Sequence, residues 1–450
     1  MTHLAAKCRR TRRSPRPSPA SAASNNAAGK LLGCKESLTM TIQNVEAHLL
    51  SCPLPEPLKL KYYGGERTIL KRDAMLIRVT GDGLTGYGPG AASEAGKHTI
   101  ETVIAPFLRG RVLADVDALR VQFLEGPGRD EAVMKVYCSI EIALYDLLGK
   151  STKLPVSELV GSRVRDRIRL YGSAGMYMPP EGYAAEAAAI QAMGFRAYKL
   201  RAGIGPEQDL ETVRLVRKAT GPDFDIMVDA HTWWRMGDSS YSDATVERMA
   251  RALGEAGVAW LEEPMPPDDH DAYQRLRALD LAPLASGEHE PSETTFMDLI
   301  FRDSVDYVQM DLVCQGGYAS ARRLLPEIAH AGLRFAFHSW GTALEVLAAA
   351  QLGICWPEMV VEWLEYPCYS SETSAGMYPF PLASAMLKEP LKLEGGDLIV
   401  PSGPGLGIEV DESVIARYPW IPGPWSFFSM DSPKETWAVT SDHSVKWDTK

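Results

Sequence analysis

The chain has 450 residues, of which 45% are hydrophobic and 23% are charged, so it has the composition and length of a globular protein with room for two domains. No apolar stretch approaches the roughly 18 residues that cross a bilayer, so we expect neither a membrane helix nor a membrane partner. The net charge of −11 includes a basic head, residues 1–39, with eight Lys or Arg against one acid; the rest carries −18, which disfavours nucleic acid as a partner.

Two features bear on the compartment of the protein. Residues 1–39 are rich in Arg, Ser, Pro and Ala and lack periodicity, so we expect them to be disordered. They form an organelle transit peptide or an extension upstream of a start at Met40, with a nucleic-acid arm as a weaker alternative. Pro15, Pro17 and Pro19 favour the extension because they would break a transit peptide's helix. The seven cysteines form no CxxC pair, which indicates idle thiols in a reducing compartment and a cytoplasmic location.

Residues 40–165 are predicted to form a separate α+β domain, because strands come first and helices follow without alternation. The expected strands are Ile42–Ser51 and Met75–Thr80, with a Pro-, Gly- and Tyr-rich loop at Pro53–Glu66 between them. Helical periodicity follows at Thr99–Leu108 and again at Val136–Leu148.

Residues 166–381 alternate between short apolar runs and helical segments, which is typical of a parallel (β/α) barrel. The expected strands are Ile168–Gly172, Ala197–Leu200, Asp225–Asp229, Trp260–Glu262, Leu284–Glu288, Tyr307–Asp311, Arg334–His338 and Met359–Leu364. The expected helices are Pro180–Met193, Glu207–Ala219, Asp243–Ala256, Asp269–Leu279, Ser292–Arg302, Ala319–Ala331 and Thr342–Cys355. Residues 382–450 leave this alternation, and we expect them to return to the first domain and to end in a polar tail.

Three carboxylates end successive predicted strands, namely Asp229, Glu262 and Glu288. All strand C-termini of a parallel barrel open on one face, so these acids would converge there. They would repel one another unless a cation lay between them, and hard carboxylate oxygens suit Mg²⁺ best, with Mn²⁺ possible. The alternative for any one of them is a solvated carboxylate in a loop.

The next strand ends carry a candidate base. Asp311 and His338 end adjacent strands, so the carboxylate can accept a hydrogen bond from one imidazole nitrogen and leave the other as a base. Lys199 and Arg201 both face the barrel interior, where a substrate carboxylate would balance their charge; a buried structural ion pair is the alternative.

With these residues in place, the chain resembles the enolase superfamily, in the group of mandelate racemase, muconate lactonizing enzyme and the acid-sugar dehydratases, over about residues 40–425. The resemblance is carried by Lys199-x-Arg201, Val228-Asp229-Ala230-His231, Trp260-Leu261-Glu262-Glu263-Pro264, Gly287-Glu288-His289, Asp311, His338 and Leu364-Glu365, with support from Ile142–Lys150 and Gly403–Gly407. It implies a modified (β/α)7β barrel, an α+β cap built from both chain ends, and closure of the Pro53–Glu66 loop over the substrate. It also implies a homo-oligomer and a Mg²⁺-assisted removal of the proton alpha to a carboxylate, with Glu365 as a hydrogen-bond donor to that carboxylate if burial raises its pKa.

Two details separate the reactions of this family. Racemases of this type carry a Lys-x-Lys pattern. The second position of the pattern here is Arg201, which stays protonated and is a poor base. His231 follows Asp229 as in the aldonate dehydratases, where the histidine protonates the departing hydroxyl; in strand geometry it would lie beside the metal ligand. We therefore expect a hydro-lyase that converts a sugar acid, aldonate or aldarate, to a 2-keto-3-deoxy acid.

Several alternatives stay open at this point. An epimerase, racemase or cycloisomerase would use the same enediolate without expelling water, and a non-catalytic binding protein on this fold is a remote possibility. His231 could bind substrate only, and Glu365 could be a solvated glutamate. Trp233, Trp234 and Arg235 either line the pocket or pack within their loop, and His289 is a candidate contact to substrate hydroxyls.

Overall fold

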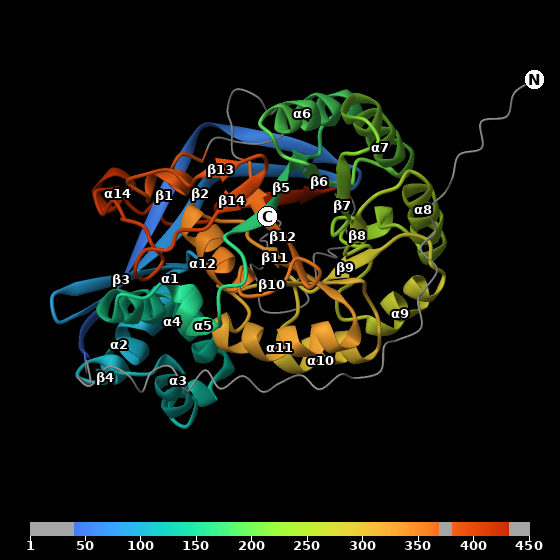
Figure 1. The fold of residues 1–450 in the computed structure, drawn as a ribbon. Coiled ribbons are helices and arrows are strands. Elements are labelled where there is room, and N and C mark those ends of the chain that lie inside the picture. The colour runs from blue at the N-terminus through green and yellow to red at the C-terminus, as the bar shows by residue number, and fades with distance from the viewer. Residues whose placement is uncertain (1–39, 369–379, 432–450) are drawn as a thin grey trace, which may run out of the picture. The chain divides into compact units, whose positions relative to one another are not determined.

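In the computed structural model, which describes residues 40–368 and 380–431, the central feature is a closed barrel of parallel strands ringed by helices (Figure 1). Each strand pairs with the next in sequence, and β12 closes the barrel by pairing with β5. The barrel strands are β5 (Arg167–Met176), β6 (Ala197–Arg201), β7 (Asp225–Asp229), β8 (Trp260–Glu262), β9 (Leu284–Ser286), β10 (Tyr307–Asp311), β11 (Arg334–His338) and β12 (Val361–Pro367). The connecting helices are α6 (Pro180–Ala192), α7 (Pro206–Thr220), α8 (Asp243–Glu255), α9 (His270–Ala278), α10 (Glu293–Phe301), α11 (Gly317–Ala331) and α12 (Ala343–Gly353), with a short turn of helix, η5 (Gly237–Ser239), after β7.

The predicted (β/α)7β barrel is therefore confirmed, and the deviations lie at strand ends. β9 stops at Ser286, so Glu288 stands in the loop beyond the strand rather than on it. β12 runs on to Pro367 because its last residues pair with β5 as far as Ser173, whereas Met359, predicted as its start, is 78% exposed and lies before the strand.

An antiparallel sheet forms the cap, with strand order β15-β2-β1-β4 and β3 paired to β2. Its strands are β1 (Met40–Tyr62), β2 (Gly65–Gly81), β3 (Leu84–Gly90), β4 (Val112–Leu113) and β15 (Ser426–Met430). Its helices are α1 (Glu94–Thr99), η3 (Ile100–Ile104), α2 (Ala105–Leu108), α3 (Val116–Leu124), η4 (Pro127–Arg129), α4 (Glu131–Thr152) and α5 (Val156–Val160). The predicted helices thus exist, but each begins five residues earlier than its periodicity indicated.

The prediction of a loop at Pro53–Glu66 is wrong. β1 continues to Tyr62 and β2 begins at Gly65, so the segment is a long hairpin with a tight turn. Proline removes a backbone donor from a ladder, and the pairing register shifts between Pro53 and Leu58, which lets the strand continue past its prolines.

The segment after residue 380 divides between the two sheets. It contains α13 (Leu382–Ala385), β13 (Leu393–Glu394), β14 (Asp397–Ile399) and α14 (Val414–Arg417). β14 pairs with β5 of the barrel, whereas β15 pairs with β2 of the cap, so the expected return to the cap is made by β15. The domain boundaries at residues 165 and 381 stay a prediction, and the expectations for residues 1–39 and for the polar tail beyond residue 431 lie outside the described residues.

A layer of side chains closes the inside of the barrel, with one contributed by each strand. It consists of Tyr171, Ala197, Met227, Trp260, Ala285, Tyr307, Ala336 and Trp363. Side chains two residues further along a strand point the same way, so the next layer toward the C-terminal face includes Lys199, Asp229, Glu262, His338 and Glu365. The apolar layer is therefore the floor on which the predicted polar site stands.

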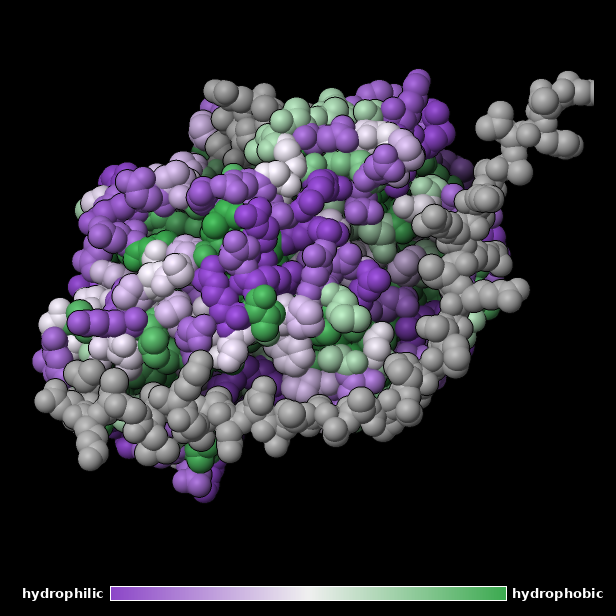
Figure 2. Space-filling model, viewed as in Figure 1, coloured by the Kyte–Doolittle hydropathy of each residue, from purple (hydrophilic) through white to green (hydrophobic). Residues whose placement is uncertain are grey.

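The surface carries scattered rather than continuous apolar groups on the face shown in Figure 2, where small hydrophobic patches lie between hydrophilic residues. Among the described residues, no helix has the length and hydropathy needed to cross a membrane.

Candidate active site

The polar layer directly above the apolar floor is a buried cluster around the Lys199 ammonium. Nζ of Lys199 lies 2.7 Å from Oε1 of Glu262, 3.1 Å from Oε1 of Glu365 and 4.0 Å from Oδ2 of Asp229. Burial alone would lower the pKa of Lys199, but Glu262 and Glu365 raise it well above its ordinary value. The side chain thus remains a cation, as a clamp for negative charge requires. Glu365 is fully buried, so it is not a solvated glutamate, but the expected rise of its pKa is wrong: Lys199, His338 and Arg201 outweigh burial and lower the pKa, so Glu365 is a carboxylate rather than a hydrogen-bond donor.

Asp229 links this cluster to His231. Its Oδ1 lies 2.6 Å from Nδ1 of His231, and its Oδ2 lies 3.5 Å from Nε of Arg201. Burial opposes the shift, but His231, Lys199 and Arg201 together lower the pKa of Asp229. Arg201 also stacks on the Trp340 ring at 3.7 Å, and its pKa is raised despite burial, so the guanidinium holds its proton.

His338 and Asp311 form the expected pair. Nδ1 of His338 lies 2.9 Å from Oδ2 of Asp311, while Nε2 lies 3.3 Å from Oε2 of Glu288 and 3.8 Å from Oε2 of Glu365. Backbone amides fix Asp311, because Val313 donates to its Oδ1 at 2.7 Å. Burial lowers the pKa of His338, but Glu288, Glu365 and Asp311 outweigh it and raise the pKa to about 10.

The acids that were predicted as metal ligands fit a divalent cation by their chemistry. Asp229 and Glu262 are paired neighbours on β7 and β8, and Oδ2 of Asp229 is buried without accepting a hydrogen bond. Burial, against the opposing effect of Lys199, raises the pKa of Glu262 to about 8, and Asp229 and Glu288 contribute to the increase. This crowding of negative charge is what a cation held by Asp229, Glu262 and Glu288 would relieve.

A second cluster of possible metal ligands lies in the same region. Glu263, Glu288 and His289 bring ligand atoms within 4.8 Å of one another. However, Arg235 contacts Nε2 of His289 at 2.9 Å and can only donate there, so the proton of this neutral imidazole is on Nδ1, 2.6 Å from Oε2 of Glu263. A protonated Nδ1 cannot bind a metal, so we assign this group to a proton-bearing network rather than to a cation.

This network was not predicted. Glu263 has a φ of 43°, in the region that favours glycine, and its carbonyl accepts a hydrogen bond from Nε1 of Trp234. Arg235 stacks on Trp234 at 4.2 Å, so the loops after β7, β8 and β9 are tied together. The sequence offered only the second Glu of Glu262-Glu263 as a signal, and nothing in the pattern distinguished its role.

Two residues in the loops beside the site, Trp233 and His289, were left open between packing and a contact to substrate. Trp233 is fully buried and donates to Oδ2 of Asp209 on α7 at 3.0 Å, so it packs its loop against α7. Asp209 also accepts from the Tyr241 hydroxyl, and burial raises its pKa to about 6. His289, the candidate substrate contact, has both ring nitrogens bonded to protein groups.

Comparison with known proteins identifies the family. Residues 182–414 match the enolase C-terminal domain-like family, and residues 52–161 match the N-terminal domain of the mandelate racemase / muconate lactonizing enzyme family. The chain belongs to the enolase superfamily. It is similar to a D-galactarolactone cycloisomerase of Agrobacterium fabrum, with 29% identity over 84% of this chain and 99% of the relative. It is also similar to an L-rhamnonate dehydratase of Saccharopolyspora erythraea, with 27% identity over 75% of this chain and 83% of the relative.

The fold is also similar to those of solved structures. A putative mandelate racemase of Bordetella bronchiseptica, complexed with 2-oxoglutarate/phosphate, has a TM-score of 0.75 and 29% identity over 86% of this chain and all of its own. An enolase of alpha proteobacterium BAL199 with bound magnesium has a TM-score of 0.69 and 25% identity over 84% of this chain and 99% of its own. Members of this superfamily bind Mg²⁺, and this chain is an enzyme-family member whose relatives catalyse more than one kind of reaction.

Proposed function

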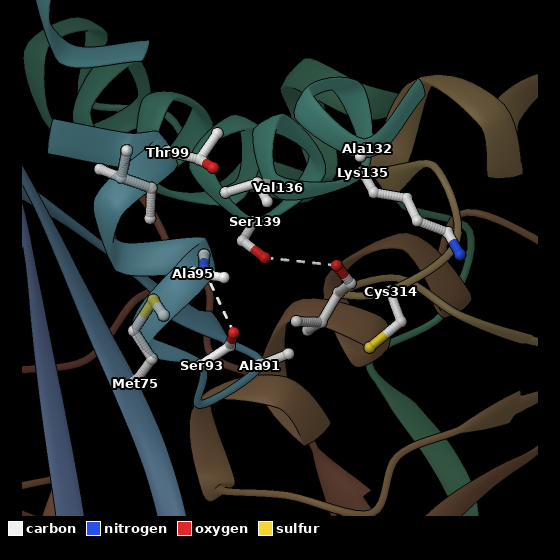
Figure 3. Close-up of a pocket in the computed structure, with 13 residues that line it drawn as sticks. Met75, Ala91, Ser93, Ala95, Thr99, Ala132, Lys135, Val136, Ser139 and Cys314 are labelled. Carbon is white, nitrogen blue, oxygen red and sulfur yellow. Dashed lines mark hydrogen bonds between the residues drawn. The ribbon is translucent and has the colours of Figure 1, made fainter. Parts of the chain in front are cut away.

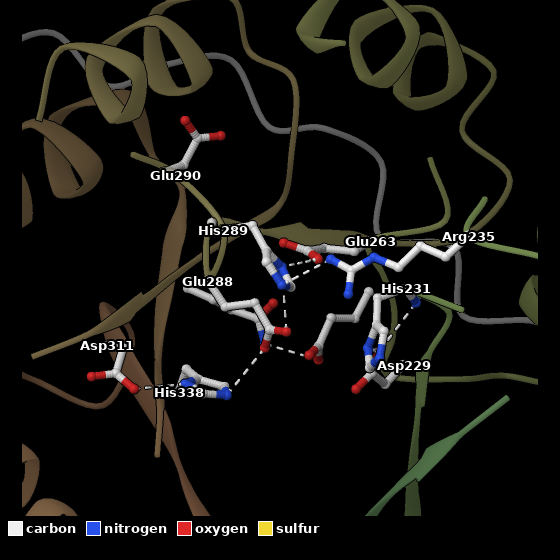
Figure 4. A network of polar contacts seen from close by, with 12 residues as sticks. Asp229, His231, Arg235, Glu263, Glu288, His289, Glu290, Asp311 and His338 are labelled. Carbon is white, nitrogen blue, oxygen red and sulfur yellow. Dashed lines mark hydrogen bonds and ion pairs between the residues drawn. The ribbon is translucent and has the colours of Figure 1, made fainter. Parts of the chain in front are cut away.

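We propose that this protein is a Mg²⁺-dependent dehydratase of a sugar acid, which removes the proton alpha to the carboxylate and expels the beta hydroxyl. The observation that carries the proposal is the pair of imidazoles on either side of the acids (Figure 4). Each is bonded through Nδ1 to a carboxylate, His338 to Asp311 and His231 to Asp229, so each directs its chemistry through Nε2.

Asp229, Glu262 and Glu288 would hold the Mg²⁺, which when bound supplies electrostatic stabilisation of negative charge on the substrate carboxylate. The buried ammonium of Lys199 and the guanidinium of Arg201 act on the same charge. A cation held by Glu288 would offset the negative charge that raises the pKa of His338, so that Nε2 could accept the alpha proton, and the Asp311 carboxylate stabilises the imidazolium that forms.

The second half of the reaction needs an acid. His231 donates a proton to the beta oxygen as the C–O bond breaks, and Asp229 orients its ring from Nδ1. The alkene bond forms between the alpha and beta carbons, and the resulting enol tautomerises to a 2-keto-3-deoxy acid. Arg201 keeps its proton and cannot serve as the second base of a Lys-x-Lys racemase, so elimination is favoured over racemisation by that pair of bases.

A cycloisomerase is the second candidate, and the similarity to D-galactarolactone cycloisomerase favours it. The same residues would act, but the leaving oxygen would belong to a ring of the substrate. The proton from His231 would then stay on the opened chain, and the product would be an isomer of the substrate rather than a molecule lighter by one water.

The test is a screen of aldonates, aldarates and their lactones and anhydro forms with Mg²⁺ in D₂O, followed by mass spectrometry and NMR. A keto product that has lost one water and carries deuterium at C3 supports dehydration. A keto product isomeric with its cyclic substrate supports the cycloisomerase. Inversion or exchange at C2 without any keto product would reject both.

A further inference from the structure

We propose that Gln315 is a positioning residue that couples Glu288 to the Asp311–His338 pair, an inference that rests on the proposed function. Gln315 lies between β10 and α11 and is 8% exposed. Its Nε2 donates to the carbonyl oxygens of Gly287 at 2.7 Å and of Glu290 at 2.8 Å. Its Oε1 accepts from the backbone N–H of Asp311 at 2.8 Å. One side-chain amide thus joins the loop after β9 to the end of β10.

The loop held by this amide carries Glu288 and His289. Gly287 and Glu290 bracket these two residues, and the backbone N–H of Glu290 donates to the Gly287 carbonyl at 3.0 Å. Gly287 has a φ of 136°, and a Cβ at this position would lie 2.1 Å from the Gln309 carbonyl of β10. The loop therefore passes against β10 with no side chain between them, and the amide of Gln315 sets its height above the strand.

The other end of the coupling is the turn after Asp311. Val313 and Cys314 donate their backbone N–H groups to Oδ1 of Asp311, and the Ser139 hydroxyl of α4 donates to the Val313 carbonyl at 3.3 Å (Figure 3). The turn also walls a cavity of about 470 Å³ against α1 and α4. These contacts hold the turn without Gln315, so loss of the amide would leave Asp311 in place. It would loosen the backbone of the Glu288 loop, which would then be held through His289 by Arg235 and Glu263.

The consequence is a change in the distance between Glu288 and His338. Their nearest atoms are 3.3 Å apart. Glu288 lies in the loop that the amide holds, whereas His338 ends β11 and is held by Asp311. Outer partners of metal ligands of this kind are typically worth roughly 10–100-fold in metal affinity or activity. A displacement of about 1 Å near reacting groups can cost about 10²-fold in rate.

The chain offers a matched control in Gln351. It is also buried, accepts from the Ser157 N–H at 3.1 Å, and donates to the carbonyls of Pro401 at 3.1 Å and Leu406 at 3.2 Å. Gln351→Met and Gln315→Met thus each remove one accepted and two donated hydrogen bonds from the interior, but the partners of Gln351 lie outside the site.

The experiment measures Mn²⁺ binding by electron paramagnetic resonance without substrate, and kcat and KM for a substrate found by the screen, for the wild type and both variants. Gln315→Met is expected to weaken Mn²⁺ binding by about tenfold or more and to lower kcat with a smaller effect on KM. Gln351→Met is expected to change both by less than about twofold while lowering the melting temperature to a similar extent.

Equal Mn²⁺ affinity for the two variants would overturn the proposal. Should Gln315→Met fail to fold, Gln315→Asn keeps a neutral amide but shortens the side chain by one methylene, so it cannot reach all three partners, and its Mn²⁺ affinity decides in the same way. If the wild type binds Mn²⁺ but eliminates nothing, the proposed function fails, while the comparison of Gln315 with Gln351 still decides this proposal. A wild type that does not bind Mn²⁺ would overturn it whatever reaction the protein catalyses.

Discussion

Replacement of Lys199 by Met tests the charge balance of the site without any substrate. The ammonium lies 2.7 Å from Glu262 and 3.1 Å from Glu365, and all three side chains are fully buried. Removing one partner of such a cluster leaves carboxylates uncompensated, at a cost of about 3–5 kcal/mol in the free energy of unfolding. At about 2 °C per kcal/mol for a large domain, the metal-free protein should melt roughly 6–10 °C lower.

Thermal unfolding with and without Mg²⁺ measures this effect. A cation bound by Asp229, Glu262 and Glu288 would replace part of the missing charge, so Mg²⁺ should raise the melting temperature of Lys199→Met more than that of the wild type. Lys388→Met is the control, because Lys388 pairs with Glu409 on the exposed surface, where solvent screens the pair, and its loss should leave the melting temperature nearly unchanged. An unchanged melting temperature for Lys199→Met, or equal Mg²⁺ effects on it and the wild type, would show that Lys199 does not balance the charge of these carboxylates.

Three further predictions concern single side chains. His338→Asn should reduce turnover below detection while circular dichroism and Mn²⁺ binding persist; residual turnover within tenfold of the wild type would count against His338 as the base. His231→Asn should lower the elimination rate by roughly 10²–10⁴ yet leave exchange of the C2 proton measurable by NMR in D₂O, and loss of that exchange as well would reject its role as the acid. Burial raises the pKa of Glu186 to about 7, so its stabilising effect is present below pH 4.5 and is lost as the pH rises through about 7. The free energy of unfolding, measured by urea titration, should therefore fall between pH 5 and 8 by up to about 3 kcal/mol less in Glu186→Gln than in the wild type. Identical pH profiles for the two proteins would contradict this.

The sequence predicted the barrel well because each strand is a short apolar run that ends in a polar residue. β7, β10 and β11 begin and end where their runs do, and the acids Asp229 and Asp311 are their last residues. A parallel strand buried on both faces has few alternatives to this pattern, so local sequence suffices.

The remaining features depend on contacts between distant segments. The hairpin through Pro53 was taken for a loop because its prolines are strand breakers, and only pairing with β2 across a register shift lets the strand continue. Likewise Gln315 and Arg235 are ordinary polar residues in loops, and their partners, Gly287 and His289, lie 28 and 54 residues away. No periodicity relates such positions, so the bonds that set the geometry of the site could not be inferred.

In the proposed function, Asp229, Glu262 and Glu288 bind one divalent ion, and His338 faces that ion across the substrate carboxylate. Anomalous diffraction from crystals grown with Mn²⁺ and a sugar acid tests it most directly. We predict a single strong Mn²⁺ peak within coordination distance of the three carboxylates, with Nε2 of His338 directed at the alpha carbon. A peak at Glu263 and His289 instead, or a His338 ring turned away from the ligand, would contradict the account.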